Sequence, residues 1–291
     1  MQHKSGFVNI IGSPNVGKST LMNRLVGEKL SIITSKAQTT RHRILGIVND
    51  ENYQIVFSDT PGVLDPHYKL HENMMSFVNS ALKDADIILL VTDIYETGIN
   101  HEATLKRIQK TTIPVIVLIN KIDQGTPEIL NEKVQYWAQQ LPNAEILPIS
   151  ALENVNVDIL WNKIIDILPE NPPFYDKEEL TDKPMRFFIS EMIREKIFLH
   201  YKKEVPYATQ VVVEEYFEDD NIIRIRAIIF VERPTQKGII IGHKGNKIKQ
   251  VGIEARKDIE KFVNKHIHLE LFVKVDKDWR ENEKKLDKYG Y

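Results

Sequence analysis

Near the start of the chain stands Gly12-Ser13-Pro14-Asn15-Val16-Gly17-Lys18-Ser19, which fits the spacing G-x-x-x-x-G-K-[S/T]. A mostly apolar run from Phe7 to Ile11 precedes it, as in a buried strand, and a helix-like stretch from Thr20 to Leu25 follows. Between a strand and a helix, backbone N–H groups converge at the positive end of the helix dipole. We therefore predict a phosphate-binding loop (P-loop), in which Lys18 reaches the β- and γ-phosphates and the Ser19 hydroxyl holds Mg²⁺.

The composition is that of a globular protein with one large or two ordinary domains, since the chain has 291 residues and 42% of them are hydrophobic. The chain has no cysteine, which excludes disulfides, cysteine–zinc sites and thiol catalysis. The first six residues lack the apolar core of a signal peptide, and no apolar run approaches the ~18 residues of a membrane span. We expect a soluble, cytoplasmic protein.

Residues 1–168 alternate predicted strands with predicted helices and include a hairpin whose turn is at residues 49–52. This order predicts an α/β domain with a mostly parallel sheet, in which ligands bind beyond the carboxyl ends of the strands. The polar stretch 29–41 is predicted to be a loop. After the first strand and helix, the expected strands are 44–48, 53–58, 87–91, 114–119 and 145–149, and the expected helices are 69–84, 101–110, 127–140 and 157–168.

Two further motifs lie at predicted strand ends. Asp59-Thr60-Pro61-Gly62 would on its own be an ordinary turn, but behind a P-loop its carboxylate can hold Mg²⁺ through a water, and the Gly62 N–H can meet a γ-phosphate. Asn120-Lys121-Ile122-Asp123 points to guanine, because guanine offers two adjacent donors to a carboxylate, whereas adenine would leave a buried Asp123 unpaired. Asn120 would tie this loop to the P-loop, and the Lys121 stem would cover the base.

Together these motifs resemble those of a translation-factor-related P-loop GTPase. The resemblance implies that Thr40 closes over Mg²⁺ and the γ-phosphate, with Thr39 as the alternative, and that the N–H groups of Ser150-Ala151 meet guanine O6. It gives as catalytic residues Asn15, Lys18, Thr40 and Gly62, and as magnesium ligands Ser19, Thr40 and Asp59. The expected nucleotide-binding residues are Gly12, Ser13, Pro14, Asn15, Val16, Gly17, Lys18, Ser19, Thr20, Asp59, Thr60, Pro61, Gly62, Val63, Asn120, Lys121, Asp123, Ser150, Ala151 and Leu152.

The position after Gly62 departs from a common GTPase pattern. Many GTPases carry there a glutamine that orients the attacking water, whereas this chain has Val63, which has no polar side-chain group. In related GTPases with a hydrophobic residue here, an asparagine at the position of Asn15 helps to bind K⁺, so K⁺ is a candidate cofactor beside GTP or GDP and Mg²⁺. The alternative is that Asn15 is present for its loop conformation.

The proline-rich and acidic stretch 169–184 is predicted to be a linker. Residues 1–183 hold 17 Lys and Arg against 23 Asp and Glu, a net charge of −6, whereas residues 184–291 hold 22 against 18, a net charge of +4. The second part therefore favours an anionic partner weakly. Its expected elements, in an α-β-β-α-β order, are a helix at 185–201, strands at 208–215 and 222–231, a helix from 242 to about 263 and a strand at 268–275.

The basic stretch Ile239-Ile240-Ile241-Gly242-His243-Lys244-Gly245-Asn246-Lys247-Ile248-Lys249 resembles the core of a KH domain, in which a GXXG loop joins two helices and holds about four nucleotides. There is no acidic residue from Arg233 to Ile253. The element order matches a type II KH domain, with its extra helix placed first; the alternative is a plain helix start with a solvated basic face. The expected RNA-binding residues are Ile241, Gly242, His243, Lys244, Gly245, Lys247 and Lys249.

A P-loop GTPase domain at 1–168, a linker at 169–184 and a KH domain with a C-terminal tail at 185–291 resemble the Era family over essentially the whole chain. Further matching stretches are Gln38-Thr39-Thr40-Arg41-His42-Arg43, Ile193-Arg194-Glu195-Lys196 and Gly252-Ile253-Glu254-Ala255-Arg256. The resemblance implies a GTP-hydrolysing switch that binds near the 3′ end of 16S rRNA and assists maturation of the 30S ribosomal subunit. It also implies a monomer in the cytoplasm that partly associates with the inner face of the membrane.

Three other functions stay open at this point: a P-loop ATPase or small-molecule kinase, an RNA-binding protein with a vestigial GTPase, and a GTPase that acts on another RNA. The tail from Asp276 is also open, because Trp279, Tyr289 and Tyr291 either stack on bases or cap the domain.

Overall fold

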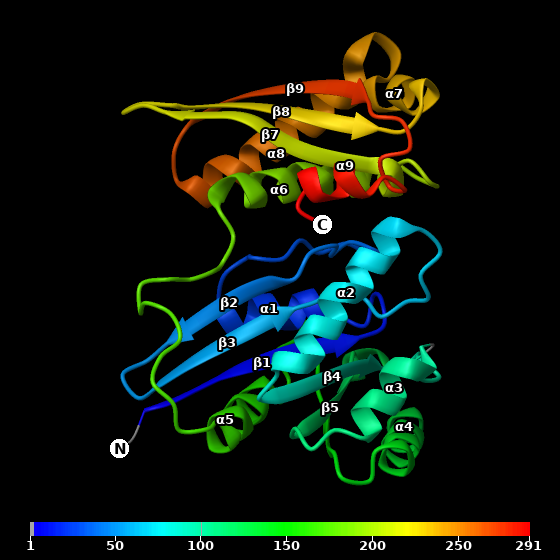
Figure 1. The fold of residues 1–291 in the computed structure, drawn as a ribbon, viewed down its shortest axis with the longest axis vertical. Coiled ribbons are helices and arrows are strands. Elements are labelled where there is room, and N and C mark those ends of the chain that lie inside the picture. Colours follow the sequence, from blue (N-terminus) through cyan, green and yellow to red (C-terminus); the bar gives the residue numbers. More distant parts are fainter. Residues whose placement is uncertain (1–2, 100) are drawn as a thin grey trace. The chain divides into compact units, whose positions relative to one another are not determined.

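The computed structural model describes residues 3–99 and 101–291 and divides into two compact units, whose elements are labelled in Figure 1. The first unit comprises Met1–His67 and His71–Asp182, and the second comprises Tyr68–Leu70 and Lys183–Tyr291. None of the helices in the described ranges is long and apolar enough to cross a membrane.

The first unit is built on a six-stranded sheet with the strand order β2-β3-β1-β4-β5-β6. Only the β2–β3 pair is antiparallel, so the prediction of a mostly parallel sheet is confirmed. β4 has no exposed residue, as expected of a strand covered on both faces. The strands are β1 (Lys4–Gly12), β2 (Ile44–Asn49), β3 (Tyr53–Asp59), β4 (Ile87–Asp93), β5 (Val115–Asn120) and β6 (Glu145–Pro148).

Helices cover both faces of this sheet. Apolar residues of α2, α3 and α4 pack with β4 and β5 into one core, which includes the fully buried Trp137. On the opposite face Trp161 of α5 lies against Tyr53 and Phe57, which alternate along β3 with Val56. The helices are α1 (Lys18–Val26), α2 (Lys69–Asp84), α3 (Glu102–Gln109), α4 (Pro127–Gln140) and α5 (Val157–Ile167).

Most of the predicted linker lies along the first unit, and we call residues 171–182 the strap. The buried Gln54 amide accepts hydrogen bonds from the N–H groups of Phe174 (2.7 Å) and Tyr175 (3.0 Å) and donates one to the Tyr175 carbonyl (2.8 Å). Leu45 N–H donates to the Asp182 carboxylate at 3.0 Å, and Ile47 N–H donates to a carbonyl of the strap at 2.8 Å. The Ser5 hydroxyl of β1 donates to the Pro172 carbonyl at 2.6 Å, so the strap is hydrogen-bonded to β1, β2 and β3.

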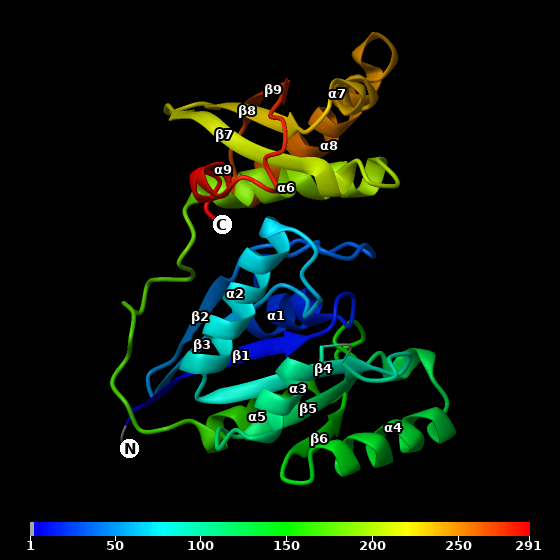
Figure 2. The same ribbon diagram turned by 45° about the vertical axis from the view of Figure 1, so that its right-hand side comes forward.

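The second unit is a three-stranded sheet with helices on one face, as Figure 2 shows. β7 and β8 are antiparallel, β8 and β9 are parallel, and α6, α7 and α8 contribute to a single core beneath the strands. The elements are α6 (Met185–His200), β7 (Thr209–Glu218), β8 (Ile223–Val231), α7 (Pro234–Ile241), α8 (Asn246–Val263), β9 (Ile267–Val275) and α9 (Glu283–Lys288).

The predicted element order of this unit was wrong in one respect, because it lacked α7. Pro234 occupies the first turn of this helix, and the Gln236 side chain accepts hydrogen bonds from the N–H groups of Glu232 and Arg233 just before it. The helix has only eight residues, with Gly238 in its interior, so it carries little periodic signal. A helix before the GXXG loop agrees with the KH resemblance.

The aromatic residues of the tail cap the second unit. Trp279 is fully buried and its Nε1–H donates to the Ala208 carbonyl at 3.1 Å. Tyr289 and Tyr291 pack against its ring at centroid distances of 5.7 and 6.3 Å, and the Tyr291 hydroxyl donates to Gln210 at 2.7 Å. Of the two alternatives for these residues, the structure therefore gives capping.

Candidate functional site

The P-loop joins β1 to α1 and requires glycine where other segments approach closely. Gly17 has a φ of 100°, and a Cβ added there would lie 2.2 Å from the side-chain nitrogen of Asn120. A Cβ at Gly12 would lie 2.1 Å from the Val91 carbonyl oxygen. The loop thus fits tightly against the carboxyl-terminal parts of β4 and β5.

Lys18 is buried inside this loop. Its ammonium donates to the carbonyl oxygens of Gly12 at 3.0 Å and Ser13 at 2.8 Å. Burial lowers the pKa of Lys18 to about 8, against the opposing attraction of Asp59 and Glu96. A phosphate bound beside this ammonium would offset the cost of burying its positive charge. The loop is therefore suited to binding an anion.

The three predicted magnesium ligands converge beside the P-loop. The Ser19 hydroxyl donates to the Asp59 carboxylate at 2.7 Å, and Thr40 Oγ1 lies 2.9 Å from Ser19 Oγ and 3.4 Å from Asp59 Oδ2. Burial raises the pKa of Asp59, although Lys18 and the hydroxyls of Ser19, Ser31 and Thr40 oppose this. Asp59 Oδ1 is buried with no hydrogen-bond partner among the described residues. Hydroxyl and carboxylate oxygens with one unsatisfied position fit Mg²⁺.

The hydroxyl of Thr39, the alternative ligand, bonds to other residues of its own loop. Thr39 Oγ1 lies 2.5 Å from Thr34 Oγ1 and donates to the Lys36 carbonyl at 2.7 Å. These contacts close a small turn within the loop at 29–41. The geometry therefore favours Thr40 over Thr39 at the metal position.

The predicted base-binding residues lie at the carboxyl end of β5. The Asn120 amide donates to the Val16 carbonyl at 2.8 Å and accepts from the Ala151 N–H at 3.0 Å, so it joins the P-loop to the segment after β6. Asp123 accepts a hydrogen bond from the Ser150 hydroxyl at 2.6 Å. One carboxylate oxygen thus accepts from Ser150, and an ionised carboxylate has further acceptor positions for a ligand with paired donors such as guanine.

Asp93, at the end of β4, is a site residue that the sequence analysis missed. Its carboxylate lies 2.6 Å from the Lys121 ammonium, which also donates to the Asn15 carbonyl at 2.7 Å. Asp93 also accepts hydrogen bonds from the N–H groups of Tyr95 and Glu96, both at 2.9 Å. The available signal was its position, since a carboxylate at the carboxyl end of a parallel strand faces the ligand edge of the sheet.

Val63 does not present its side chain to the site. It is 3% exposed and packs with Ile11 and Val78 in the core beneath α2, while its N–H donates to the Gly12 carbonyl at 3.0 Å. Gly62 packs against Pro14, 2.8 Å from where its Cβ would stand. Asn15 is exposed and has a φ of 66°, a conformation that asparagine adopts more readily than most residues.

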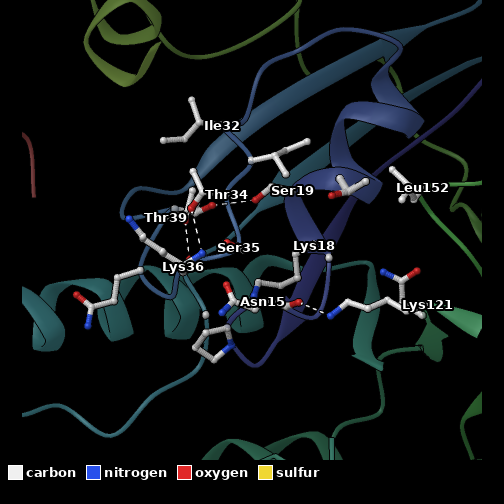
Figure 3. A pocket seen from close by; sticks show the side chains of 18 of the residues that line it. Asn15, Lys18, Ser19, Ile32, Thr34, Ser35, Lys36, Thr39, Lys121 and Leu152 are labelled. Atoms are coloured by element: carbon white, nitrogen blue, oxygen red, sulfur yellow. Dashed lines mark hydrogen bonds between the residues drawn. The ribbon is translucent and has the colours of Figure 1, made fainter. Parts of the chain in front are cut away.

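A cavity of about 420 Å³ passes between these groups, and Figure 3 shows its lining. Thr34, Ser35, Lys36 and Thr39 lie to one side of Lys18, and Lys121 and Leu152 lie to the other. The predicted residues that line it are Pro14, Asn15, Gly17, Lys18, Ser19, Thr20, Thr40, Gly62, Asn120, Lys121, Asp123, Ser150 and Leu152. Thr39, predicted as the alternative to Thr40, also lines it, and the lining residues that the prediction did not include are Ile32, Ile33, Thr34, Ser35, Lys36, Gln38 and Gln124.

The remaining predicted nucleotide residues support the cavity without lining it. The Thr60 hydroxyl, for example, donates to the Ile10 carbonyl at 2.7 Å. These residues are Gly12, Ser13, Val16, Asp59, Thr60, Pro61, Val63 and Ala151.

In the second unit the GXXG loop is a sharp turn between α7 and α8. Gly242, Lys244 and Gly245 all have positive φ, at 72°, 50° and 76°. A Cβ at Gly242 would lie 2.7 Å from the Lys247 side chain, whereas one at Gly245 would meet nothing within 4 Å. His243, Lys244, Lys247 and Lys249 are exposed, and Ile241 is partly buried against the core. The loop thus presents backbone and positive charge to solvent.

Comparison with known proteins agrees with both sites. A family model described as "50S ribosome-binding GTPase" matches residues 7–121, and a KH domain model matches residues 204–280. The GTPase Era of Geotalea daltonii is 44% identical over 292 aligned residues, covering 100% of this chain and 98% of the relative, and that of Staphylococcus haemolyticus is 42% identical with the same coverage. The chain belongs to the Era family of GTPases.

Two solved Era structures resemble this Era-family chain over nearly its whole length. One, a complex of Era with MgGDPNP and nucleotides 1506–1542 of 16S ribosomal RNA, has a TM-score of 0.95 and 39% identity and covers 99% of both chains. The other, an Era variant from Aquifex aeolicus bound to GDP·AlF₄⁻, has a TM-score of 0.94 and 38% identity with the same coverage. Membership of the family excludes an ATPase or a small-molecule kinase, and the activity is GTP hydrolysis.

Proposed function

We propose that this chain is a GTP-driven switch that binds the 3′ end of 16S rRNA through its KH domain and assists assembly of the 30S subunit. The observation that carries the proposal is the 39% identical Era structure that holds this part of 16S RNA and matches 99% of the chain. The exposed GXXG loop between α7 and α8 supports it, because two glycines admit a phosphate backbone and the lysines beside them supply charge.

In the proposed mechanism the triphosphate lies along the P-loop, where the Lys18 ammonium binds the β- and γ-phosphates. Ser19, Thr40 and Asp59 hold Mg²⁺, which when bound neutralises charge on the phosphates. Thr40 and the Gly62 N–H contact the γ-phosphate, so hydrolysis releases both of their loops. Asp123 pairs with guanine, and Lys121, held by Asp93, covers the base.

The switch is tested by the affinity for an RNA of the 16S 3′-terminal sequence, measured with GDP and with a non-hydrolysable GTP analogue. We expect tighter binding with the analogue, by a free energy of about 1–3 kcal/mol, and by reciprocity a tighter analogue complex when RNA is present. Equal RNA affinities in the two nucleotide states would contradict the switch. Equal affinity for an RNA of scrambled sequence would contradict the choice of 16S rRNA.

We also propose that Asn15 helps to bind K⁺ beside the phosphates, where a cation offsets charge that develops in the transition state. The exposed Asn15 side chain at the cavity and the buried Val63 support this role. We expect a faster GTPase in K⁺ than in Na⁺ at matched ionic strength. Equal rates in the two salts would leave the left-handed backbone as the reason for asparagine at this position.

Family resemblance further supports a cytoplasmic monomer with peripheral attachment to the inner face of the membrane. Size-exclusion chromatography with light scattering tests the monomer. Co-sedimentation of the pure protein with vesicles that contain anionic lipid tests the attachment, and protein that remains entirely in the supernatant would contradict it.

A further inference from the structure

Hydrolysis of GTP requires a group that orients the attacking water, and Val63 does not supply one. The Val63 side chain is apolar, 3% exposed and packed in the core beneath α2. A side-chain amide suits the task, because its oxygen accepts a hydrogen bond from the water while its NH₂ group donates to a γ-phosphate oxygen. The candidates are the side-chain amides that line the nucleotide cavity.

Four of the described residues that line the nucleotide cavity carry a side-chain amide: Asn15, Gln38, Asn120 and Gln124. The Asn120 amide is engaged by Val16 and Ala151. Gln124 follows Asp123 at the base end of the cavity, where it accepts a hydrogen bond from Tyr95. Asn15 belongs to the P-loop itself. Gln38 comes from the loop that carries Thr40 and also lines the cavity.

The backbone places Gln38 close to the magnesium ligands. It precedes Thr40 by two residues, which span at most about 7 Å, and Thr40 Oγ1 lies 2.9 Å from Ser19 Oγ. The hydrogen bond from Thr39 Oγ1 to the Lys36 carbonyl closes the turn that contains Gln38. The P-loop and this turn therefore both contribute to the wall of the nucleotide cavity, and the turn lies within two residues of a predicted magnesium ligand.

The conformation of Gln38 is itself unusual. Its φ is 56°, in the left-handed region, and its side chain is half-buried. The left-handed backbone is strained for glutamine, whereas a glycine would adopt it without strain. Strained backbone of this kind concentrates at functional sites, where the surrounding structure maintains it.

We propose that Gln38 is a catalytic residue that orients the attacking water in GTP hydrolysis, in the place of the missing glutamine after Gly62. Its amide oxygen accepts a hydrogen bond from the water, and its NH₂ group donates to a γ-phosphate oxygen. The water oxygen forms a bond to the γ-phosphorus, and the bond to the β–γ bridging oxygen breaks with its electron pair remaining on GDP. The released phosphate takes the water proton, so the amide gains and loses none. The assignment rests on the nucleotide site proposed above.

The decisive variant is Gln38→Gly, because glycine keeps the left-handed backbone and removes only the side chain. We expect kcat for GTP to fall by about 10-fold to 100-fold, with KM and the Kd for GDP changed less than twofold. Because GDP·AlF₄⁻ mimics the transferring phosphoryl group with its water, its complex should be lost while GDP still binds. Gln38→Asn retains an amide one methylene shorter and should recover part of the rate.

Gln109→Ala, a glutamine on α3 outside the cavity, is the matched control and should leave kcat unchanged. The proposal is overturned if kcat of Gln38→Gly stays within threefold of the parent, or if GDP affinity falls by the same factor as kcat. Rates are measured in K⁺ and in Na⁺, and the loss should be present in both. A parent protein that neither binds nor hydrolyses GTP would instead refute the proposed nucleotide site, so the two failures are distinguishable.

Discussion

The nucleotide site and the GXXG loop both recognise phosphates, yet they are constructed differently. In the nucleotide site, side chains bond to groups in distant segments: Asn120 donates to the Val16 carbonyl, and Ser19 donates to the Asp59 carboxylate. In the GXXG loop the recognition element is one short segment whose backbone has positive φ, flanked by exposed lysines. The first site is a network of hydrogen bonds centred on buried side chains such as Asn120 and Asp59, and the second is an exposed backbone turn.

This difference determines how each site should fail. A buried network depends on every partner, because a polar group left without one loses its full hydrogen-bond energy in a low-dielectric setting. An exposed turn depends on open space and summed charge, so adding a side chain or a negative charge should matter more than removing one lysine. Four experiments probe this contrast, beginning with the largest expected effect.

Exchange of the base-pairing carboxylate should give the largest change. Asp123→Asn replaces an acceptor by a group that also donates, so it should weaken guanine nucleotides by about 10³-fold or more. Xanthine, whose C2 carries an oxygen in place of the amino group, should bind better to the variant than to the parent. Equilibrium binding of GDP and XDP measures both effects. A variant that retains GDP affinity within tenfold would show that Asp123 does not pair with the base.

A negative charge in the GXXG loop should have the next largest effect. Gly242→Asp puts a carboxylate in the loop and a Cβ 2.7 Å from the Lys247 side chain, so RNA affinity should fall by about 10-fold to 100-fold. GDP affinity should not change. Gly238→Asp is the control, because it adds the same charge in the preceding helix α7 at a position with open space. Equal losses in the two variants would indicate a general charge effect.

The pH dependence of nucleotide binding tests the buried lysine. The pKa of Lys18 in the free protein is lowered to about 8, and bound phosphates favour its charged form. Affinity is therefore full below pH 8 and falls as the pH rises through 8, by about 10-fold at pH 9. Titrations with GDP at pH 7, 8 and 9 measure this. Lys18→Arg stays charged and should lack the dependence, and an identical fall in that variant would assign it to another group.

Removal of a single lysine beside the GXXG loop should have the smallest effect. Lys249→Ala should weaken RNA binding only a few-fold at moderate salt and reduce the slope of log affinity against log salt by about 1. Lys261→Ala, on the same helix α8 but distant in sequence from the loop, is the control. A loss as large as that of Gly242→Asp would mean that Lys249 makes a specific contact and not only a phosphate contact.

The site residues that belong to short motifs, and the elements with a clear periodic pattern, could be predicted from the sequence. The positions of the P-loop, Asp59, Asn120 and Asp123 at the carboxyl ends of strands follow from spacing, because parallel strands bring their ends to one edge. The order of the six-stranded sheet did not follow from it. Asp93 was missed because its role depends on which strand neighbours β5, and that neighbour is fixed by long-range pairing.

Other features were beyond the sequence for different physical reasons. The eight-residue α7 has too few turns for a periodic signal, although the Pro234 at its start was a usable one. Trp279 is apolar and aromatic whether it stacks on a base or fills a core, so only its burial decides. Thr39 and Thr40 are chemically equal neighbours, and their roles are separated by their hydrogen bonds, from Thr39 to the Lys36 carbonyl and between Thr40 and Ser19.

The strap has a consequence for where the chain can be cut. A first unit truncated after Leu168 would leave the fully buried Gln54 amide without the three hydrogen bonds that it makes to Phe174 and Tyr175. It would also uncover the apolar cluster of Leu45, Ile47 and Val56 against which Tyr175 packs. Unpaired buried groups cost about 1–3 kcal/mol each. A fragment that ends after Asp182 keeps all of these contacts. It should therefore be the shortest form of the first unit that survives limited proteolysis.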